Sequence, residues 1–153
     1  MEAGERELCA RKNFLDGCNC PQSVVRAFDD VLQEHDIDPV TAMRLASPFG
    51  GGMGRMREVC GAVSGMLMIL GLVEGYTDPA DDQHKAELYA HVQELADKFR
   101  QEHGTIICRE LLGKGEGSEA PTPEARTQAY YHARPCAEFC ATAARILGEY
   151  LEQ

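Results

Sequence analysis

The feature that most constrains the fold is an uncharged apolar run over residues 59–73. A helix formed by this run is apolar on every side, so it belongs at the centre of a hydrophobic core. The run is shorter than the roughly 20 apolar residues that a membrane-spanning helix needs. Gly61 and Gly65 are four residues apart, so one face of the helix is nearly bare backbone. We expect a second helix, or a cofactor, to approach that face closely.

The other segments also read as helices, because no stretch alternates apolar and polar residues with a period of two. Helical spacing of apolar residues and the positions of proline and glycine predict further helices over 2–15, 22–34, 39–46, 78–103, 106–113 and 136–151, with a short helical turn within 125–133. We therefore expect an all-α, single-domain bundle of about six or seven helices over residues 1–153, built around the central helix 59–73.

The charge balance argues against a nucleic-acid binder, since the net charge is -10 and no basic cluster offsets it. Residues 1–15 are charged throughout and lack the apolar stretch of a signal peptide. We therefore expect a cytoplasmic protein without a membrane span. The composition does not decide between a monomer and a homodimer.

Two loops stand out between the helices. Residues 49–54 read Phe-Gly-Gly-Gly-Met-Gly, which favours neither helix nor strand and predicts a pliable loop leading to Cys60. This loop lacks the Lys-Ser/Thr ending and the preceding strand of a phosphate-binding loop, so nucleotide binding is discounted. Residues 114–123 are polar and rich in Gly, Glu and Pro, which predicts a mobile surface loop.

Seven cysteines are present, an odd number that favours redox chemistry or metal binding over a static disulfide framework in a cytoplasmic chain. Cys20, Cys60 and Cys136 lie at or near predicted helix starts. There, unpaired N–H groups and the helix dipole favour the thiolate by about one pKa unit. Neighbouring arginines are expected to add to this effect, namely Arg57, Arg109 and Arg134.

The order of these motifs resembles the family of small redox-active proteins named for its cysteine pattern, C_GCAxxG_C_C. The resemblance covers nearly the whole chain and rests on the following segments: Asn19-Cys20-x-Gln22-Ser23, the glycine loop 49–54, Cys60-Gly-Ala-x-x-Gly65, Cys108-x-x-Leu111-Leu112-Gly113 and Cys136. It implies four key cysteines, Cys20, Cys60, Cys108 and Cys136. A similar segment occurs in split-Soret-type cytochromes, where it is linked to an iron–sulfur centre, but this chain has no C-x-x-C-H haem site.

Two redox mechanisms remain open at this point. One is thiol–disulfide exchange, with Cys20 and Cys60 as an example of a reactive pair drawn from distant segments. The other is electron transfer through an iron–sulfur cluster held by all four cysteines, with backbone N–H groups of Gly50, Gly51 and Gly52 reaching the cofactor. Either mechanism makes the chain a candidate oxidoreductase or electron carrier with an unknown redox partner protein. The alternative from another class is a structural zinc or metal domain without redox activity, in which the same four thiolates are ligands.

The remaining cysteines and the histidines are expected to have simpler roles. Cys9 and Cys140 are predicted to pack in the core, although Cys140 shares a helix face with Cys136. Cys18 is either an auxiliary thiol or an ordinary loop cysteine. His84 and His91 are expected on a solvated helix surface.

Overall fold

The central apolar helix forms the axis of the fold. The computed structural model describes residues 1–153, and α6 (Gly61–Glu74) buries Ala62, Val63, Met66, Ile69 and Leu70. The helix begins two residues later than its apolar run, because Val59 pairs with Ile107 in an isolated antiparallel bridge. One continuous hydrophobic cluster surrounds α6 and includes residues from most of the chain.

The rest of the chain is helical, with no strand, so the predicted all-α single-domain fold is confirmed. The further elements are α1 (Ala3–Leu15), α2 (Cys20–Val25), η1 (Arg26–Phe28), α3 (Asp29–Glu34), α4 (Pro39–Ala46), η2 (Ser47–Phe49), α5 (Gly50–Met53), α7 (Asp82–His103), α8 (Cys108–Leu111), α9 (Gln128–Ala133) and α10 (Cys136–Leu151). None of the helices combines the length and apolar character needed to cross a membrane.

Helix boundaries follow local capping. Asn19 caps α2 by accepting from the Gln22 backbone N–H, while the Gln22 side chain accepts from the Asn19 N–H. This reciprocal pair satisfies two N–H groups that a helix start leaves free. The long helix α7 begins at Asp82 and not at 78 as predicted, because the Asp81 side chain accepts from the His84 N–H and caps it there. The predicted helix 22–34 is divided by the 3₁₀ turn η1.

The bare face of α6 receives another helix, as its glycines predict. A Cβ atom at Gly61 would lie 2.7 Å from Pro21 Cδ, and one at Gly65 would lie 2.8 Å from the Pro21 carbonyl oxygen. Contacts this short leave no room for a side chain. The spacing of glycines on α6 therefore brings α2, with Cys20 at its start, directly against the helix that follows Cys60.

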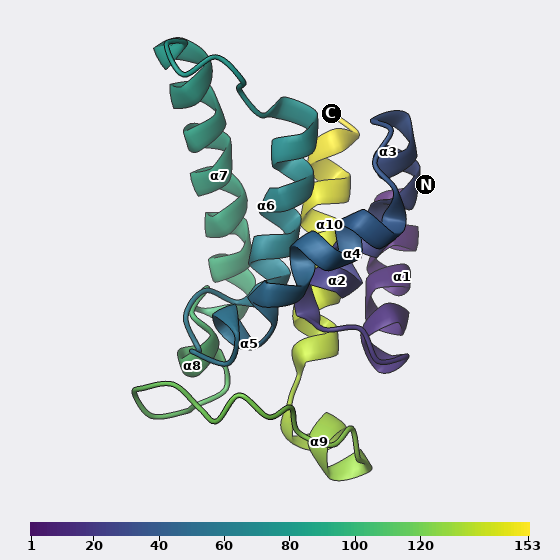
Figure 1. Cartoon of the computed structure of the whole chain (residues 1–153), viewed down its shortest axis with the longest axis vertical. Coiled ribbons are helices and arrows are strands. Elements are labelled where there is room, and N and C mark those ends of the chain that lie inside the picture. The colour runs from purple at the N-terminus through teal and green to yellow at the C-terminus, as the bar shows by residue number, and fades with distance from the viewer.

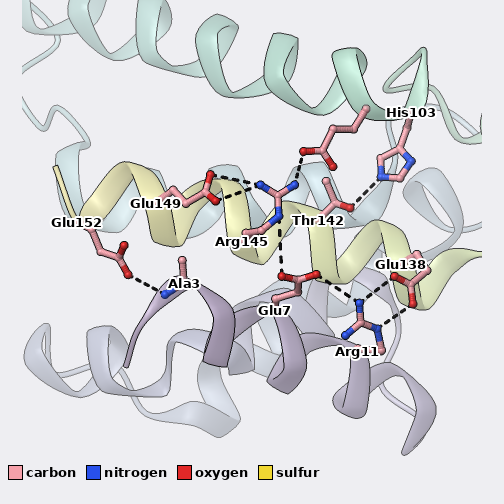
Figure 2. A network of polar contacts seen from close by, with 10 residues as sticks. Ala3, Glu7, Arg11, His103, Glu138, Thr142, Arg145, Glu149 and Glu152 are labelled. Carbon is pink, nitrogen blue, oxygen red and sulfur yellow. Dashed lines mark hydrogen bonds and ion pairs between the residues drawn. The ribbon is translucent and has the colours of Figure 1, made fainter.

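The first and last helices pack together and close the bundle. Gly148 on α10 allows this approach, since a Cβ there would lie 2.9 Å from Ala3 Cα. Figure 2 shows the polar contacts along this contact line, where Arg11 of α1 donates to Glu138 of α10 at 2.8 Å. Arg145 of α10 also reaches Glu149 on its own helix. Figure 1 shows α6 and α10 starting at one end of the bundle, where α5, α8 and α9 also lie.

Candidate functional site

The four family-pattern cysteines each stand at a helix start. Cys20 and Cys108 are the first residues of α2 and α8, Cys60 is the N-cap of α6, and Cys136 is the first residue of α10. All four line one cavity of about 370 Å³. The predicted convergence of these cysteines is therefore what the structure shows.

Backbone pairing fixes the relative positions of Cys60 and Cys108. The Cys60 N–H donates to the Ile106 carbonyl at 2.7 Å, and the Cys108 N–H donates to the Glu58 carbonyl at 2.6 Å. These two hydrogen bonds flank the bridge between Val59 and Ile107. The segments before α6 and α8 are thereby held side by side, and both deliver a cysteine to the cavity wall.

The four cysteines differ in access to solvent. Cys60, Cys108 and Cys136 are only 3%, 8% and 6% exposed. Cys20 is half-buried, and it is thus the most accessible of the four.

Three thiols interact with one another around Cys20. Cys136 and Cys140 lie one turn apart on α10, and both thiols shift the pKa of Cys20. Cys140 also lies 3.6 Å from the Cys20 carbonyl oxygen. Cys140 is fully buried and belongs to the core, as predicted, but it also touches the site. The i,i+4 spacing of Cys136 and Cys140 was the signal in the sequence for this shared face.

At these thiols, burial raises the pKa by more than the position at a helix start lowers it. Cys136 lowers the pKa of Cys20, but Cys140, burial and the charge of Cys60 leave that pKa well above its usual value. Burial raises the pKa of Cys60 to about 12, although the N–H groups of Ala62 and Val63 act in the opposite direction. The pKa of Cys136 is raised by Cys20 and by burial. The expectation that helix starts favour the thiolate is therefore wrong in the net result, because desolvation disfavours the charged form more.

Cys108 has a cationic neighbour. Arg57 is 2% exposed, and its Nη1 lies 3.6 Å from Cys108 Sγ. Burial raises the pKa of Cys108, while the hydrogen bond and charge of Arg57 lower it. Arg134 likewise lowers the pKa of Cys136. Arg109, expected to act in the same way, instead donates to the Met56 carbonyl oxygen at 2.9 Å.

The glycine loop is a left-handed turn. Gly51, Gly52, Met53, Gly54 and Arg55 all have positive φ, between 57° and 69°. The turn closes with N–H donation from Arg57 to the Gly51 carbonyl at 3.1 Å and from Glu58 to the Gly52 carbonyl at 2.9 Å. A left-handed conformation costs roughly 1–2 kcal/mol at each residue with a side chain. The surrounding contacts must therefore hold this conformation, which the sequence analysis did not anticipate.

Gly50, Gly51 and Gly52 line the cavity together. A Cβ at Gly52 would lie 2.8 Å from Cys108 Cβ, and one at Gly50 would lie 2.6 Å from Asn19 Nδ2. The backbone of the turn thus forms part of the cavity wall, in contact with the residues that carry the cysteines. Binding of a cofactor by these glycines is not shown by their position.

Residues 114–127, here called the strap, cover one side of the cavity. Glu119 accepts from Arg57 Nε at 3.0 Å and pairs with Arg55 and Lys114, both at 2.8 Å. Pro121 and the following part of the strap line the cavity. The mobility predicted for residues 114–123 stays a prediction, but the sequence analysis did not anticipate Glu119, which meets three cations at once. No local pattern signals these distant partners.

Two further interactions fix the strap. Glu124 pairs with Arg134, and Arg55 Nε donates to the Ala120 carbonyl oxygen at 2.6 Å. The four arginine–carboxylate pairs of the strap are largely shielded on the arginine side, with side-chain exposures of 17% or less. The strap is therefore held by charge pairs more than by apolar burial.

The remaining predicted residues lie outside the cavity. Cys9 and Cys18 are half-buried. The prediction that Cys9 packs in the core is therefore confirmed only in part. Cys9 accepts a long contact of 3.7 Å from Asn13, and the auxiliary role of Cys18 stays a prediction. His91 is not simply solvated, since its Nδ1 lies 2.7 Å from Glu74 Oε2.

A metal ion needs several donor side chains gathered around one point. No group of three or more His, Cys, Asp or Glu side chains is arranged so that it could hold a metal ion. A single tetrahedral ion requires four ligand atoms within about 2.3 Å of one point. The thiols in their present arrangement therefore do not form a ready zinc site.

An all-α bundle with a cavity lined by four helix-start cysteines defines a class of cysteine-centred proteins, distinct from Cys-x-x-Cys proteins built on βαβ units. Residues 18–150 match the family described as Putative redox-active protein (C_GCAxxG_C_C), and the chain belongs to that family. No curated protein matches the chain. No solved structure matches it either.

Proposed function

We propose that this protein carries out thiol–disulfide exchange, with Cys20 as the attacking thiol and Cys136 as the resolving thiol. The observation that carries the proposal is the placement of Cys20 and Cys136 on the wall of one cavity, where each thiol shifts the pKa of the other. Cys60, the partner suggested by sequence, influences the pKa of Cys20 only through its charge. Membership of a redox family supports this reading.

The exchange has two steps. The Cys20 thiolate attacks one sulfur of a substrate disulfide, forms a mixed disulfide and releases the first substrate thiolate. The Cys136 thiolate then attacks Cys20 sulfur, closes the Cys20–Cys136 disulfide and releases the second. The substrate disulfide gains two electrons, and the protons of Cys20 and Cys136 end on the two released thiols. The reverse sequence reduces the protein.

The raised thiol pKa values predict slow exchange at neutral pH, because the thiolate is the nucleophile. Cys136 partly offsets this at Cys20, since it acts to lower the pKa of that thiol. Seven free cysteines, none in a disulfide, also fit a reducing compartment such as the cytoplasm.

The second candidate is electron transfer through an iron–sulfur cluster. The shared cavity of Cys20, Cys60, Cys108 and Cys136, with Arg57 beside Cys108, supports it. Four thiolates are the usual ligands of such clusters, and a cluster supplies one-electron transfer when bound. Arg57 would then offset part of the negative charge of the thiolates. A structural zinc site is less favoured, because no ligand group suited to one ion is formed.

A thiol count and metal analysis on anaerobically purified protein test the proposal. Reduced protein treated with a small disulfide should lose two free thiols, and peptide mapping should find Cys20 joined to Cys136. Cys20→Ser should abolish this loss. Cys136→Ser should slow it, with any remaining bridge from Cys20 to Cys140. Cys9→Ser, outside the cavity, is the control and should behave as the parent protein.

Different results would point elsewhere. Stoichiometric iron and sulfide, with visible absorption that bleaches on dithionite, would establish the cluster in place of exchange. Colourless protein with stoichiometric zinc would establish the structural site. A metal-free Cys20→Ser protein that still loses two thiols would rule out Cys20 as the reactive group.

A further inference from the structure

The cavity wall is positively charged in a chain that is otherwise acidic. Four arginines and one glutamate line the cavity: Arg55, Arg57, Arg126, Arg134 and Glu124. Glu119 pairs with Arg55 and Arg57. Even when its charge is included, the cavity wall has two positive charges in excess. The chain as a whole carries a net charge of -10. The cavity is therefore a local exception that attracts anions.

Arg126 supplies one of these excess charges. It forms no ion pair with a carboxylate, and its guanidinium donates instead to the Phe14 carbonyl at 2.9 Å and the Cys18 carbonyl at 3.0 Å. The guanidinium carbon lies 4.3 Å from the centre of the Phe14 ring. Neutral carbonyls and an aromatic face position Arg126 without cancelling its charge. Its contact with the Cys18 carbonyl places that charge two residues before Cys20.

Tyr130 adds a hydrogen-bonding group to the same wall. It lines the cavity, its ring lies 5.1 Å from the Arg126 guanidinium and 4.9 Å from that of Arg134, and its hydroxyl has no protein partner. Burial is the main cause of its raised pKa, and the charges of Cys136 and Cys20 also act on it. Tyr130 therefore shares the cavity wall with the arginines and the thiol pair, as a neutral donor for a bound anion.

Access to the thiols limits the size of the substrate. Cys136 is 6% exposed, and the strap covers one side of the cavity. A disulfide on the surface of a folded partner protein, the type of partner expected from sequence, cannot reach this depth unless its loop enters the cavity. The volume of about 370 Å³ falls within the range of small-molecule sites.

We propose that the substrate of the thiol pair is a small disulfide that carries carboxylates, held by Arg126 and Tyr130 while Cys20 attacks its sulfur. This assignment rests on the proposed exchange activity and names its substrate class. The carboxylate remains bound as the disulfide breaks, and each released half leaves as a carboxylated thiol. The electrons pass to the substrate sulfurs as described for the exchange.

Matched small disulfides of opposite charge test this assignment. The reduced protein is mixed with dithiodipropionate, neutral hydroxyethyl disulfide or cystamine at low salt, and the loss of thiols is followed over time. Each rate is divided by that of a free thiol with the same disulfide, which removes differences in leaving group. We expect the anion to be preferred over the cation by about tenfold or more, as for other charged clefts. The preference should shrink as salt screens the charges.

Variants assign the preference to Arg126. Arg126→Gln should bring the ratio of anion to cation rates toward unity, whereas Arg126→Lys, which keeps the charge, should preserve most of it. Arg44→Gln is the matched control, since Arg44 is exposed on α4 and does not line the cavity. It removes the same charge from the chain and should leave the ratio unchanged. Circular dichroism checks that each variant is folded.

The outcomes separate the two proposals. If no disulfide oxidises the thiols, the exchange function itself fails. If all three react at equal normalised rates, or if a folded protein disulfide reacts faster than dithiodipropionate, exchange stands and the small anionic substrate is overturned. A preference that survives in Arg126→Gln would place the anion site elsewhere on the wall.

Discussion

Gly61 lies where the helix that carries Cys20 meets the helix that Cys60 caps. An added Cβ would lie 2.7 Å from Pro21 Cδ, 2.9 Å from the Phe49 carbonyl oxygen and 3.0 Å from Cys20 Cβ. The Pro21 ring and the Phe49 carbonyl group cannot rotate away, so the backbone of α2 would have to move. The absence of a side chain at one position thus controls the distance between two segments that carry cysteines.

Gly61→Ala should therefore destabilise the protein although alanine favours helix. Overpacking costs roughly 1–3 kcal/mol, against a gain of about 1 kcal/mol in helix propensity. We expect a net loss of about 1 kcal/mol or more in the free energy of unfolding, measured by urea denaturation. The displacement of Cys20 should also slow its oxidation.

Gly71→Ala on the same helix is the control. A Cβ at Gly71 meets nothing within 4 Å, so only the propensity gain of about 1 kcal/mol should remain. Gly61→Ala should lower the free energy of unfolding, and Gly71→Ala should raise it. Equal stabilisation by both would show that α2 does not press on α6 at Gly61.

Among the elements, the strap depends most on charge. Arg57 and then Lys114 hold the pKa of Glu119 down at about 2. A carboxyl with a depressed native pKa contributes stability above its unfolded pKa of about 4.3 and loses it as pH falls toward the native value. The strap should therefore stay closed at neutral pH and loosen between about pH 4 and about pH 2.

Glu119→Gln should loosen the strap at neutral pH. The variant keeps the shape of the side chain but removes the charge that Arg55, Arg57 and Lys114 share. Proteinase K should cleave within 114–127 several times faster, because cleavage follows local opening. Glu116→Gln, an exposed change in the same strap, should cleave at the parent rate. Equal cleavage of both variants would mean that Glu119 does not hold the strap.

Helices were predictable where their causes are local. The apolar run of α6, the Asn19 cap and the glycines facing Pro21 all act within a few residues or one helix face, so sequence periodicity reveals them. The order of the strap was not predictable, since Glu119 meets Arg57 across 62 positions. The left-handed turn was missed in the same way, because Met53 and Arg55 adopt positive φ only when the rest of the fold holds them there.

At the scale of the whole molecule, buried thiols couple stability to alkaline pH. Burial or a neighbouring thiol raises the pKa of Cys20, Cys60, Cys108, Cys136 and Cys140. A group with a raised native pKa stabilises the fold fully below its unfolded pKa, about 8.5 for cysteine. That stabilisation is lost as pH rises toward the native value, since only the unfolded chain releases the proton.

The free energy of unfolding should therefore fall between about pH 8 and about pH 10. Each such thiol contributes up to about 1.4 kcal/mol per pH unit, and urea denaturation of the reduced protein measures the sum. Cys60→Ala should make the free energy of unfolding fall less steeply with pH, by the contribution of one thiol. A stability that stays flat over this interval would show that the thiols are not shielded from solvent in the native protein.

The convergence of the cysteines was predictable at this scale, whereas the chemistry around them was less so. Motif order placed Cys20, Cys60, Cys108 and Cys136 in one site, and the cavity contains all four. Their raised pKa values depend on how deeply the thiols are buried, and a position at a helix start does not indicate that depth. The place of Arg126 on the cavity wall was not predicted, because this residue follows a polar loop and precedes no motif.

The packing of α10 along α1 also orders events during synthesis. When the ribosome has made the first hundred or so residues, α1 packs against α2 and η1 but lacks α10, its main neighbour, and Cys20 still lacks the thiol of Cys136. Both needs are met together once α10 emerges from the exit tunnel. A nascent chain is thus protected against premature oxidation at this pair by the simple order of translation, and it gains its reactive pocket in the same step that completes its core.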